Sequence, residues 1–327
     1  MTHPLVSIVI ETITARFDTR GTTLADVLAG PINAIARQTY PADRIETIVV
    51  VDDAVAQADV SEIRRRYPDI KLVPSGVSNY FAAKNSGAAA GSGEYVVFLD
   101  GDCVPEPDCV ELLVERFEPD VAVVAGRVRY TGGSWTARIF SVPDFAYIMS
   151  EQDGQANGLN LSNGAFRRDV LMKLPLDARL RRDGGCYQLF HRIRATGARA
   201  LYEPRAVAAH GIDVGGLGFI RKHYGRGYDG TAVYKLDETG LFRGTSWYRR
   251  FGPLALVALT GRRILLDWRR MARHRKQIGF SLLALPAYAA LGASLRLVEL
   301  AGGVAASLTR QPSSPGGVSS GLAGKSS

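Results

Sequence analysis

The segment Tyr95-Val96-Val97-Phe98-Leu99-Asp100-Gly101-Asp102 decides the fold class of this chain of 327 residues. Its apolar residues, in unbroken succession, predict a strand that is covered on both faces, and the acids follow where that strand ends. Four other short runs rich in Val and Ile have the same character and lie at residues 6–13, 45–51, 70–73 and 121–125. Such strands are typical of parallel sheets, because helices cover both faces of a parallel sheet.

Helical patterns separate these strands. Apolar residues at helical spacing occupy residues 24–28 and 60–67, and an alanine-rich stretch covers 82–90 before Gly91-Ser92-Gly93 stops it. Residues 110–117 carry apolar side chains at i, i+3, i+4 and i+7. Strands that alternate with helices form βαβ units, so we expect an α/β fold with a doubly wound, mostly parallel sheet.

The cysteines and the amino terminus favour a reducing compartment. The chain has three cysteines, Cys103, Cys109 and Cys186, which are too few for a disulfide framework and lack the C-x-x-C spacing of a structural zinc site. The first residues enter a strand pattern without a basic segment, so we expect no secretory signal.

Positive charge is concentrated near the carboxyl end. The net charge is +8, yet residues 219–276 hold 14 Lys and Arg against 4 Asp and Glu, which leaves the remainder slightly acidic. These cations are interleaved with aliphatic runs, and no zinc-finger, RRM or KH signature is present. We therefore expect contact with anionic lipid headgroups and not with nucleic acid.

Two apolar runs flank the most basic stretch, at residues 252–268 and 278–295. A spanning helix needs about 20 apolar residues, so the second run is borderline and the first is too short. The cations at 268–276 fit a cytoplasmic flank, which predicts a membrane-associated region on the cytoplasmic face of the cell membrane. A pair of soluble core helices is the alternative. The tail at 310–327 is rich in Ser, Gly and Pro and is predicted to be disordered.

Acidic residues end two of the predicted strands. Asp52 and Asp53 follow the second strand, and Asp100 and Asp102 follow the fourth. Ligands of open α/β sheets bind at the carboxyl ends of the strands. In extended backbone, side chains at i and i+2 point the same way, so Asp100 and Asp102 can converge on one cation. Carboxylate oxygens suit Mg²⁺ or Mn²⁺, which typically bridge substrate phosphates.

Several motifs occur in a fixed order over residues 5–212. They are Val6-Ser7-Ile8-Val9-Ile10, Arg37-Gln38-Thr39-Tyr40-Pro41, Glu46-Thr47-Ile48-Val49-Val50-Val51-Asp52-Asp53, Ala83-Lys84-Asn85-Ser86-Gly87, Ala90-Gly91-Ser92-Gly93-Glu94-Tyr95, Leu99-Asp100-Gly101-Asp102, Asn163-Gly164-Ala165-Phe166-Arg167-Arg168, and Glu203-Pro204 with Val207 and His210. In this order they resemble the motifs of the family 2 glycosyltransferases, which have the GT-A fold. The ordered set is far more specific than any one of its members.

The resemblance implies a donor site and a metal site. The donor-binding residues would be Thr12, Asp52, Asp53, Lys84 and Asp100. The ligands of Mg²⁺ or Mn²⁺ would be Asp100, Asp102 and His210. Asp52 and Asp53 would contact the nucleotide base, Lys84 would lie near the nucleotide or its diphosphate, and Thr12 would offer backbone contacts. The sequence Glu11-Thr12-Ile13 stands where the family usually has P-T-Y-N.

The catalytic base is where the chain departs from the family. The family's acidic pair before the helix expected at 187–196 is replaced by Gly185-Cys186, and the nearest carboxylate is Asp183. Asp183 is therefore the candidate base that would deprotonate the acceptor hydroxyl, the alternative being a simple pair with Arg181 or Arg182. Nearby cations at 221, 222 and 226 would line the acceptor or diphosphate side, or belong to a solvated amphipathic helix.

These features predict a metal-dependent, inverting glycosyltransferase that moves a sugar from a nucleotide-diphosphate sugar to a lipid-linked glycan or polysaccharide acceptor. A degenerate subunit that binds the nucleotide sugar without turnover is the alternative. A sugar nucleotidyltransferase is disfavoured, since Gly21-Thr22-Thr23 is a poor substitute for the glycine-rich loop of those enzymes. We expect a catalytic domain at 1–215, with a nucleotide-sugar half at 1–126 and an acceptor half at 127–215. A helical membrane-associated region would follow at 216–309.

Overall fold

A single sheet organises the first two-thirds of the chain. The computed structural model describes residues 3–15, 22–131, 138–139, 141–149, 154–211 and 216–309. Within these residues eight strands form one sheet in the order β3-β2-β1-β4-β7-β6-β8-β5. Their bounds are β1 Val6–Glu11, β2 Ile45–Val51, β3 Lys71–Pro74, β4 Tyr95–Asp100, β5 Cys103–Pro105, β6 Val121–Tyr130, β7 Asn163–Arg167 and β8 Arg199–His210.

The α/β prediction is confirmed, and the sheet is mixed. β1 lies parallel to β2 and β4, and β2 lies parallel to β3, as the alternating pattern predicts. Beyond β4 the direction changes, because β7 is antiparallel to both β4 and β6, and β5 is antiparallel to β8. β6 and β8 are parallel. The longest run of parallel neighbours is therefore β3-β2-β1-β4, which carries the acidic strand ends.

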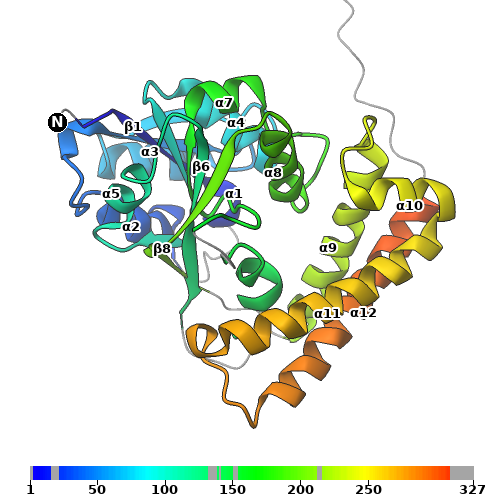
Figure 1. Ribbon diagram of the computed structural model, residues 1–327. Helices are drawn as coiled ribbons and strands as arrows, with labels where there is room; N and C mark the ends of the chain where they lie inside the picture. Colours follow the sequence, from blue (N-terminus) through cyan, green and yellow to red (C-terminus); the bar gives the residue numbers. More distant parts are fainter. Residues whose placement is uncertain are drawn as a thin grey trace, which may run out of the picture.

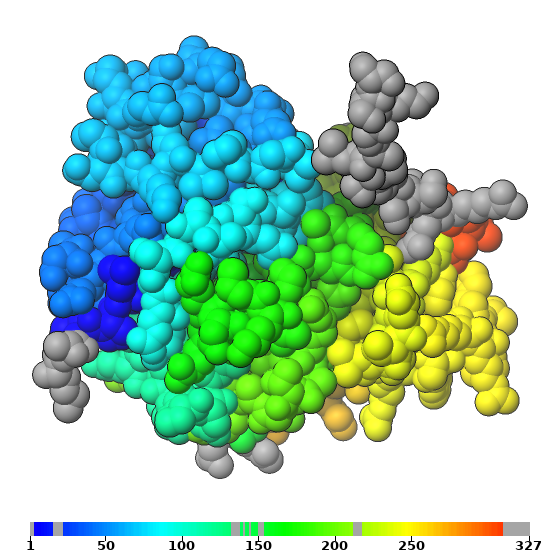
Figure 2. Space-filling view, turned by 90° about the horizontal axis from the view of Figure 1, so that it is seen from above, coloured from blue at the N-terminus to red at the C-terminus, as the bar shows by residue number. Residues whose placement is uncertain are grey.

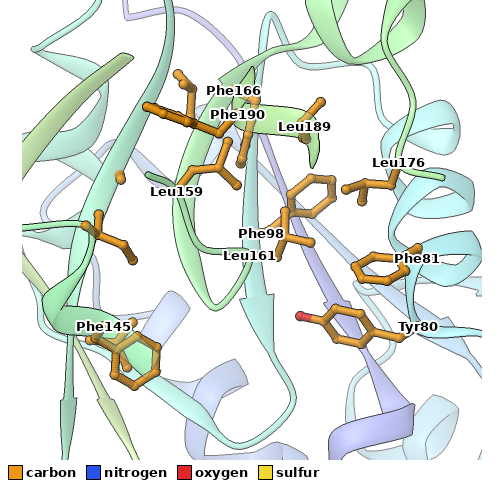
Figure 3. Packing of buried hydrophobic residues seen from close by; sticks show 14 of the residues in the cluster. Tyr80, Phe81, Phe98, Phe145, Leu159, Leu161, Phe166, Leu176, Leu189 and Phe190 are labelled. Carbon is orange, nitrogen blue, oxygen red and sulfur yellow. The ribbon is translucent and has the colours of Figure 1, made fainter. Parts of the chain in front are cut away.

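Both faces of the sheet are buried, which explains the unbroken apolar runs. Val9 and Phe98 point to one face, while Ile8 and Leu99, next to them in sequence, point to the other. Figure 3 shows how aromatic and leucine side chains of α4, β4, β7 and α8 meet over the first face. The rings of Phe98 and Phe166 lie 5.3 Å apart there.

Short helices cover the two faces. Between residues 12 and 195 they are α1 Thr12–Ala15, α2 Leu24–Ile35, α3 Gln57–Arg66, α4 Tyr80–Ala90, α5 Cys109–Val114, α7 Arg168–Lys173 and α8 Gly185–Ala195. Two single turns, η2 Ala42–Arg44 and η3 Val142–Ala146, lie in connections. α4, α7 and α8 contribute to the core on one face, and α2, α3 and α5 to the core on the other (Figure 1).

Gly87 sets the distance between α4 and the sheet. A Cβ atom at this position would lie 2.2 Å from Val9 Cγ1 and 2.8 Å from Val50 Cγ2, so only glycine lets the helix pack this closely. The contact fixes the height of α4 over β1, and with it the position of the α4 side chains that reach the carboxyl ends of the strands.

Four helices form an arm beside the sheet. They are α9 Gly216–Leu236, α10 Arg243–Phe251, α11 Pro253–Ile278 and α12 Leu285–Leu308, and α12 packs along both α9 and α11 (Figure 1). Figure 2 shows the first part of this arm, in yellow, against the green residues around α8. The Phe242 and Tyr187 rings make that contact at 5.2 Å.

The apolar run predicted at 278–295 is not one helix, which corrects that expectation. α11 continues through the basic stretch as far as Ile278, and Gly279, with a φ of 90°, ends it. The second apolar helix therefore begins only at Leu285. Among the described residues, α12 alone is long and apolar enough to cross a membrane, with a mean hydropathy of 1.4. The tail at 310–327 and the predicted boundary at residue 215 lie outside the described residues.

Candidate donor and metal site

The carboxylate of Asp100 is the best-anchored group at the carboxyl end of the sheet. Its Oδ1 accepts hydrogen bonds from the Tyr80 hydroxyl at 2.7 Å and from Lys84 Nζ at 2.9 Å. Its Oδ2 accepts one from the Ser162 hydroxyl at 2.7 Å. Burial alone would raise the pKa of Asp100, but the positive charges of Lys84 and Arg182 hold it well below its usual range. Asp100 is therefore a fixed anion.

Lys84 is completely buried beneath this acid. Its ammonium group donates to Asp100 and to the backbone carbonyls of Leu99 at 2.8 Å and Leu161 at 2.9 Å. An ammonium group has three donors, so each has an acceptor within the protein. Lys84 therefore acts on the site through Asp100, while its position near the nucleotide or its diphosphate stays a prediction.

Asp102 lies among other groups that can bind a metal. One ligand atom each from Asp100, Asp102, Cys103 and His210 falls within 4.8 Å of the others. His210 reaches the cluster because β8 returns antiparallel to β5, where His210 pairs with Cys103. Burial and the neighbouring charge of Asp100 raise the pKa of Asp102. Two anions at this turn are therefore costly unless positive charge offsets them.

The ring of His210 is oriented for ligation. Its Nδ1 lies 2.6 Å from the Gly211 carbonyl oxygen, which can only accept, so Nδ1 carries the proton. The opposite nitrogen, Nε2, lies 3.6 Å from Asp102 Oδ1, and in the neutral ring its lone pair would be available to a metal. The ring packs edge-on against Tyr130 at 5.0 Å. A backbone partner on one nitrogen and a carboxylate near the other is a usual arrangement for a metal-binding histidine.

The predicted nucleotide residues lie at the ends of the adjacent strands. The Thr12 hydroxyl accepts a hydrogen bond from the Asp52 backbone N–H at 2.9 Å, which ties the end of β1 to the end of β2. Asp52 is buried and Asp53 is exposed. The structure thus brings Thr12 and Asp52 together, with the Asp100 turn on the other side of β1.

Glu11 belongs to the same site, and the sequence analysis did not select it. It is fully buried and accepts hydrogen bonds from the Thr14 N–H at 3.0 Å and the Thr14 hydroxyl at 2.6 Å. The Thr14 oxygen in turn accepts the Gly101 N–H at 2.9 Å, between the two acids of the turn. Burial raises the pKa of Glu11 to about 7. The sequence feature that could have identified Glu11 is its position as an acid at the end of the apolar strand β1.

Arg182 supplies a second cation that the sequence analysis did not select for this site. Its guanidinium group lies 4.8 Å from the centre of the Tyr80 ring, and Tyr80 bonds Asp100. Burial opposes the charge, but the fields of Tyr80, Asp100 and Glu11 raise the pKa of Arg182 above its usual value. Arg182 therefore adds a permanent positive charge close to Asp100 and Glu11.

Asp183 pairs with a different arginine from either predicted partner. Its Oδ1 lies 3.5 Å from Arg226 Nε, on α9, whereas Arg181 pairs with Asp229 at 2.8 Å. Asp229 also accepts the backbone N–H groups of Arg182 and Asp183 at 3.2 and 3.3 Å. Helix α9 therefore holds the loop that carries Asp183.

Comparison with known proteins agrees with this geometry. Residues 20–174 match the family described as Glycosyl transferase family 2. The matched residues make up just under half of the chain. Glycosyltransferase AglE of Haloferax volcanii is 28% identical over 239 residues, which cover 70% of this chain and 75% of the relative.

Two further similarities extend the comparison. The glucosyl-dolichyl phosphate glucuronosyltransferase of Haloferax volcanii is 27% identical over 205 residues, which cover 55% of this chain and 62% of that protein. The mannosyltransferase PcManGT from Pyrobaculum calidifontis, solved in complex with GDP-Man and Mn²⁺, superposes with a TM-score of 0.62 at 19% identity. That superposition covers 94% of this chain and 88% of PcManGT, and it supports the GT-A-like fold.

Together these similarities support a family 2 glycosyltransferase, an enzyme with a nucleotide-sugar-binding fold. Its structure also explains the missing acidic pair. A Cβ atom at Gly185 would lie 2.4 Å from the Phe81 ring, and one at Gly184 would lie 2.4 Å from Val233 Cγ2. The start of α8 is therefore packed too closely for an acidic side chain at 185, and Cys186 is the next residue along.

Replacing the buried cation tests how strongly Asp100 depends on Lys84. We expect Lys84→Met to lower the free energy of unfolding by about 3–5 kcal/mol, because it leaves a buried carboxylate without its partner. The double variant Lys84→Met/Asp100→Asn should regain part of that loss. Urea unfolding measures both. Lys71→Met, which removes a partly exposed pair with Glu46 at 3.6 Å, is the matched control and should change stability by less than about 1 kcal/mol. A stable single variant would contradict the dependence.

The raised pKa of Glu11 predicts a specific pH dependence of stability. Below about pH 4.5 the carboxyl is neutral in both states; as the pH rises to about 7, only the unfolded chain ionises freely, so the folded state loses stability. Glu11→Gln cannot ionise, and its stability relative to wild type should therefore increase between pH 4.5 and 7, by up to about 3 kcal/mol. Urea unfolding at pH 5 and pH 8 measures the difference. The exposed variant Glu115→Gln should show no such change, and a constant offset for Glu11→Gln would refute the shift.

Proposed function

We propose that this chain transfers a sugar from a nucleotide-diphosphate sugar to a lipid-linked glycan or polysaccharide acceptor, with Mg²⁺ or Mn²⁺ bound by Asp100, Asp102 and His210. The observation that carries the proposal is the convergence of their ligand atoms within 4.8 Å at the carboxyl end of β4. Two carboxylates and one imidazole suit a divalent cation of this kind. PcManGT, a protein of similar fold, was solved with Mn²⁺ and GDP-Man.

The donor would bind across the ends of β1, β2 and β4. In this proposal Asp52 and Asp53 accept hydrogen bonds from the nucleotide base, Thr12 offers backbone contacts, and Asp100 faces the ribose. A bound cation would neutralise charge on the departing diphosphate. Arg182 would add a permanent positive charge on the same side, since its guanidinium stands next to Tyr80, which bonds Asp100.

The acceptor would approach from the side of α8 and α9. Asp183 is the proposed base that accepts the proton of the acceptor hydroxyl, and direct displacement by that hydroxyl would invert the anomeric configuration. The ion pair with Arg226 would orient the Asp183 carboxylate.

A lipid-linked acceptor is supported by one relative, whose name describes a glucosyl-dolichyl phosphate glucuronosyltransferase. We propose the division expected from the sequence, with a catalytic domain at 1–215, halves meeting near 126, and an arm at 216–309 that contacts the cytoplasmic face of the cell membrane. No nucleic acid partner is proposed.

One observation favours a second candidate, a degenerate subunit that binds the nucleotide sugar without turning it over. The close packing of Gly185 against Phe81 leaves no room for the acid usually found there. If Asp183 does not act as the base, donor binding would survive while transfer would not. The two tests below separate these functions.

The metal proposal is tested by donor binding in a thermal-shift assay. We expect a panel of nucleotide sugars to include one that stabilises the wild type in the presence of Mn²⁺, by about 2.7 kcal/mol at a concentration one hundred times its Kd. Asp102→Asn should lose the Mn²⁺-dependent part of this stabilisation. Asp43→Asn, an exposed acid outside the site, is the matched control. Stabilisation of Asp102→Asn equal to that of wild type would remove Asp102 from the metal site.

Turnover of Asp183→Asn tests the base. We expect kcat to fall by about 10²–10⁴-fold while the KM for the donor changes little, because the variant removes proton transfer and leaves the donor residues in place. Asp169→Asn, an exposed acid paired with Lys173, should keep full activity. Retained turnover in Asp183→Asn would assign the base elsewhere, and a wild type that binds donor without any transfer would favour the degenerate subunit.

A further inference from the structure

The most apolar helix of the chain carries a buried ionic network at its middle. Arg296 and Glu299 of α12 are both buried. Arg296 Nε donates a hydrogen bond to Asp267 of α11 at 2.7 Å. His223 Nδ1 of α9 lies 2.8 Å from Glu299 Oε1, within hydrogen-bond distance. Burial alone would raise the pKa of Glu299, but Arg296 and His223 hold it at about 2. The polar side of α12 therefore faces into the arm.

The neighbours of α12 hold it along its whole length. Near its start, the Trp268 indole N–H of α11 donates to the Ala289 carbonyl at 3.1 Å. In the second half a Cβ at Gly302 would lie 2.0 Å from the Tyr224 carbonyl oxygen, so α9 and α12 are in backbone contact there. At its end, Lys235 Nζ donates to the Thr309 carbonyl at 3.0 Å. α12 thus cannot leave the arm without breaking contacts at both ends.

This packing has a consequence for membrane attachment. If α12 crossed a bilayer in this structure, α9 and α11 would have to enter the hydrocarbon with it. α11 alone carries exposed Arg262, Arg269, Arg273 and Lys276. Charged side chains on the lipid-facing surface of a helix are strongly disfavoured in hydrocarbon. The arm therefore has the charge distribution of a structure that lies at a membrane surface.

One face of α11 is built for such a surface. Leu254, Val257, Leu265 and Trp268 are 75%, 55%, 59% and 43% exposed, and their spacing places them on one side of the helix. The four exposed cations named above lie beside this stripe. At 100° per residue they are about 40–100° around the helix from Leu254. We call these eight residues the α11 stripe. An apolar stripe with a tryptophan and a cationic border is the pattern of a helix that lies in the interface plane.

We propose that the arm attaches to an anionic bilayer through the α11 stripe, with α11 in the plane of the surface and α12 packed behind it without crossing. The inference deepens the membrane contact in the proposed function and rests on it. Charge complementarity selects the lipid as occupant, because a second copy of the chain would bring an identical cationic border against the first. The turn between α11 and α12 also exposes two leucines, Leu282 at 64% and Leu283 at 96%.

Flotation of the purified full-length chain with vesicles tests the surface. We expect binding to phosphatidylcholine vesicles with 30 mol% phosphatidylglycerol and weaker binding to phosphatidylcholine alone. Leu265→Glu should weaken binding to the anionic vesicles by at least about tenfold, since it places a carboxylate in the apolar stripe. Arg262→Gln/Arg269→Gln should remove most of the preference for the anionic lipid. Met172→Glu, at a 41% exposed position on α7, is the control and should bind like wild type.

A labelling experiment distinguishes lying from spanning. Ser281→Cys and Leu308→Cys place thiols near the two ends of α12, and both positions are exposed. In sealed inside-out vesicles from an expression host, both should react with a membrane-impermeant maleimide to the same extent, measured above the reaction of the native cysteines. Reaction of one position only after the vesicles are permeabilised would show that α12 spans and would overturn the proposal.

Other outcomes are equally decisive. The lipid is rejected as occupant if wild-type and Leu265→Glu chains float alike. It is also rejected if a stripe variant changes the chain from dimer to monomer in sedimentation without affecting flotation. Donor binding by Leu265→Glu is measured in parallel by thermal shift. Its retention with lost flotation supports the inference, whereas a wild type that floats but binds no donor would defeat the proposed function and leave the surface standing.

Discussion

The buried ion pair between Lys84 and Asp100 is the contact on which the site depends. It joins α4 to the end of β4, and through the Leu161 carbonyl it also joins the segment that leads into β7. Such a pair is stable only when every remaining donor and acceptor is satisfied. Tyr80 and Ser162 complete the bonds of the carboxylate, and the carbonyls complete those of the ammonium. One acid of the turn is therefore fixed by the interior of the protein.

A second line of contacts controls the rest of the turn. Glu11 holds Thr14, and Thr14 accepts the N–H of Gly101, so the end of β1 determines the backbone between Asp100 and Asp102. A Cβ at Gly101 would lie 2.7 Å from the Glu11 carbonyl oxygen, which leaves room for glycine alone. Asp102 then points toward His210, which β8 returns to the same place. Rigid backbone on both sides would let the site bind a cation without reorganising.

The arm shows how burial of charge changes the meaning of an apolar sequence. Judged by composition, α12 is the one described helix that could cross a membrane. Its two charged residues, Arg296 and Glu299, are nevertheless paired inside the arm, so its outward side carries no charged residue. The same helix can therefore serve as the inner support of a surface-bound arm. The loop of Asp183 is held by α9 of this arm, so the arm is linked physically to the loop that carries the proposed base.

The sequence by itself determined the α/β class and the strands that end in acids, because periodicity acts within a few residues of the chain. It also predicted that Asp100 and Asp102 converge, but from the rule for extended backbone, whereas Gly101 and Asp102 form a turn after β4. The ordered motifs also predicted the family. Only the tertiary structure decided that Lys84 is enclosed, that Glu11 and Arg182 join the site, and that Asp183 meets Arg226 instead of Arg181 or Arg182. The tertiary structure also decided that β7 runs antiparallel to β4 and that α11 ends at Gly279. These features depend on contacts between residues far apart in the chain, and local pattern carries no information about which distant partner a charged side chain will meet.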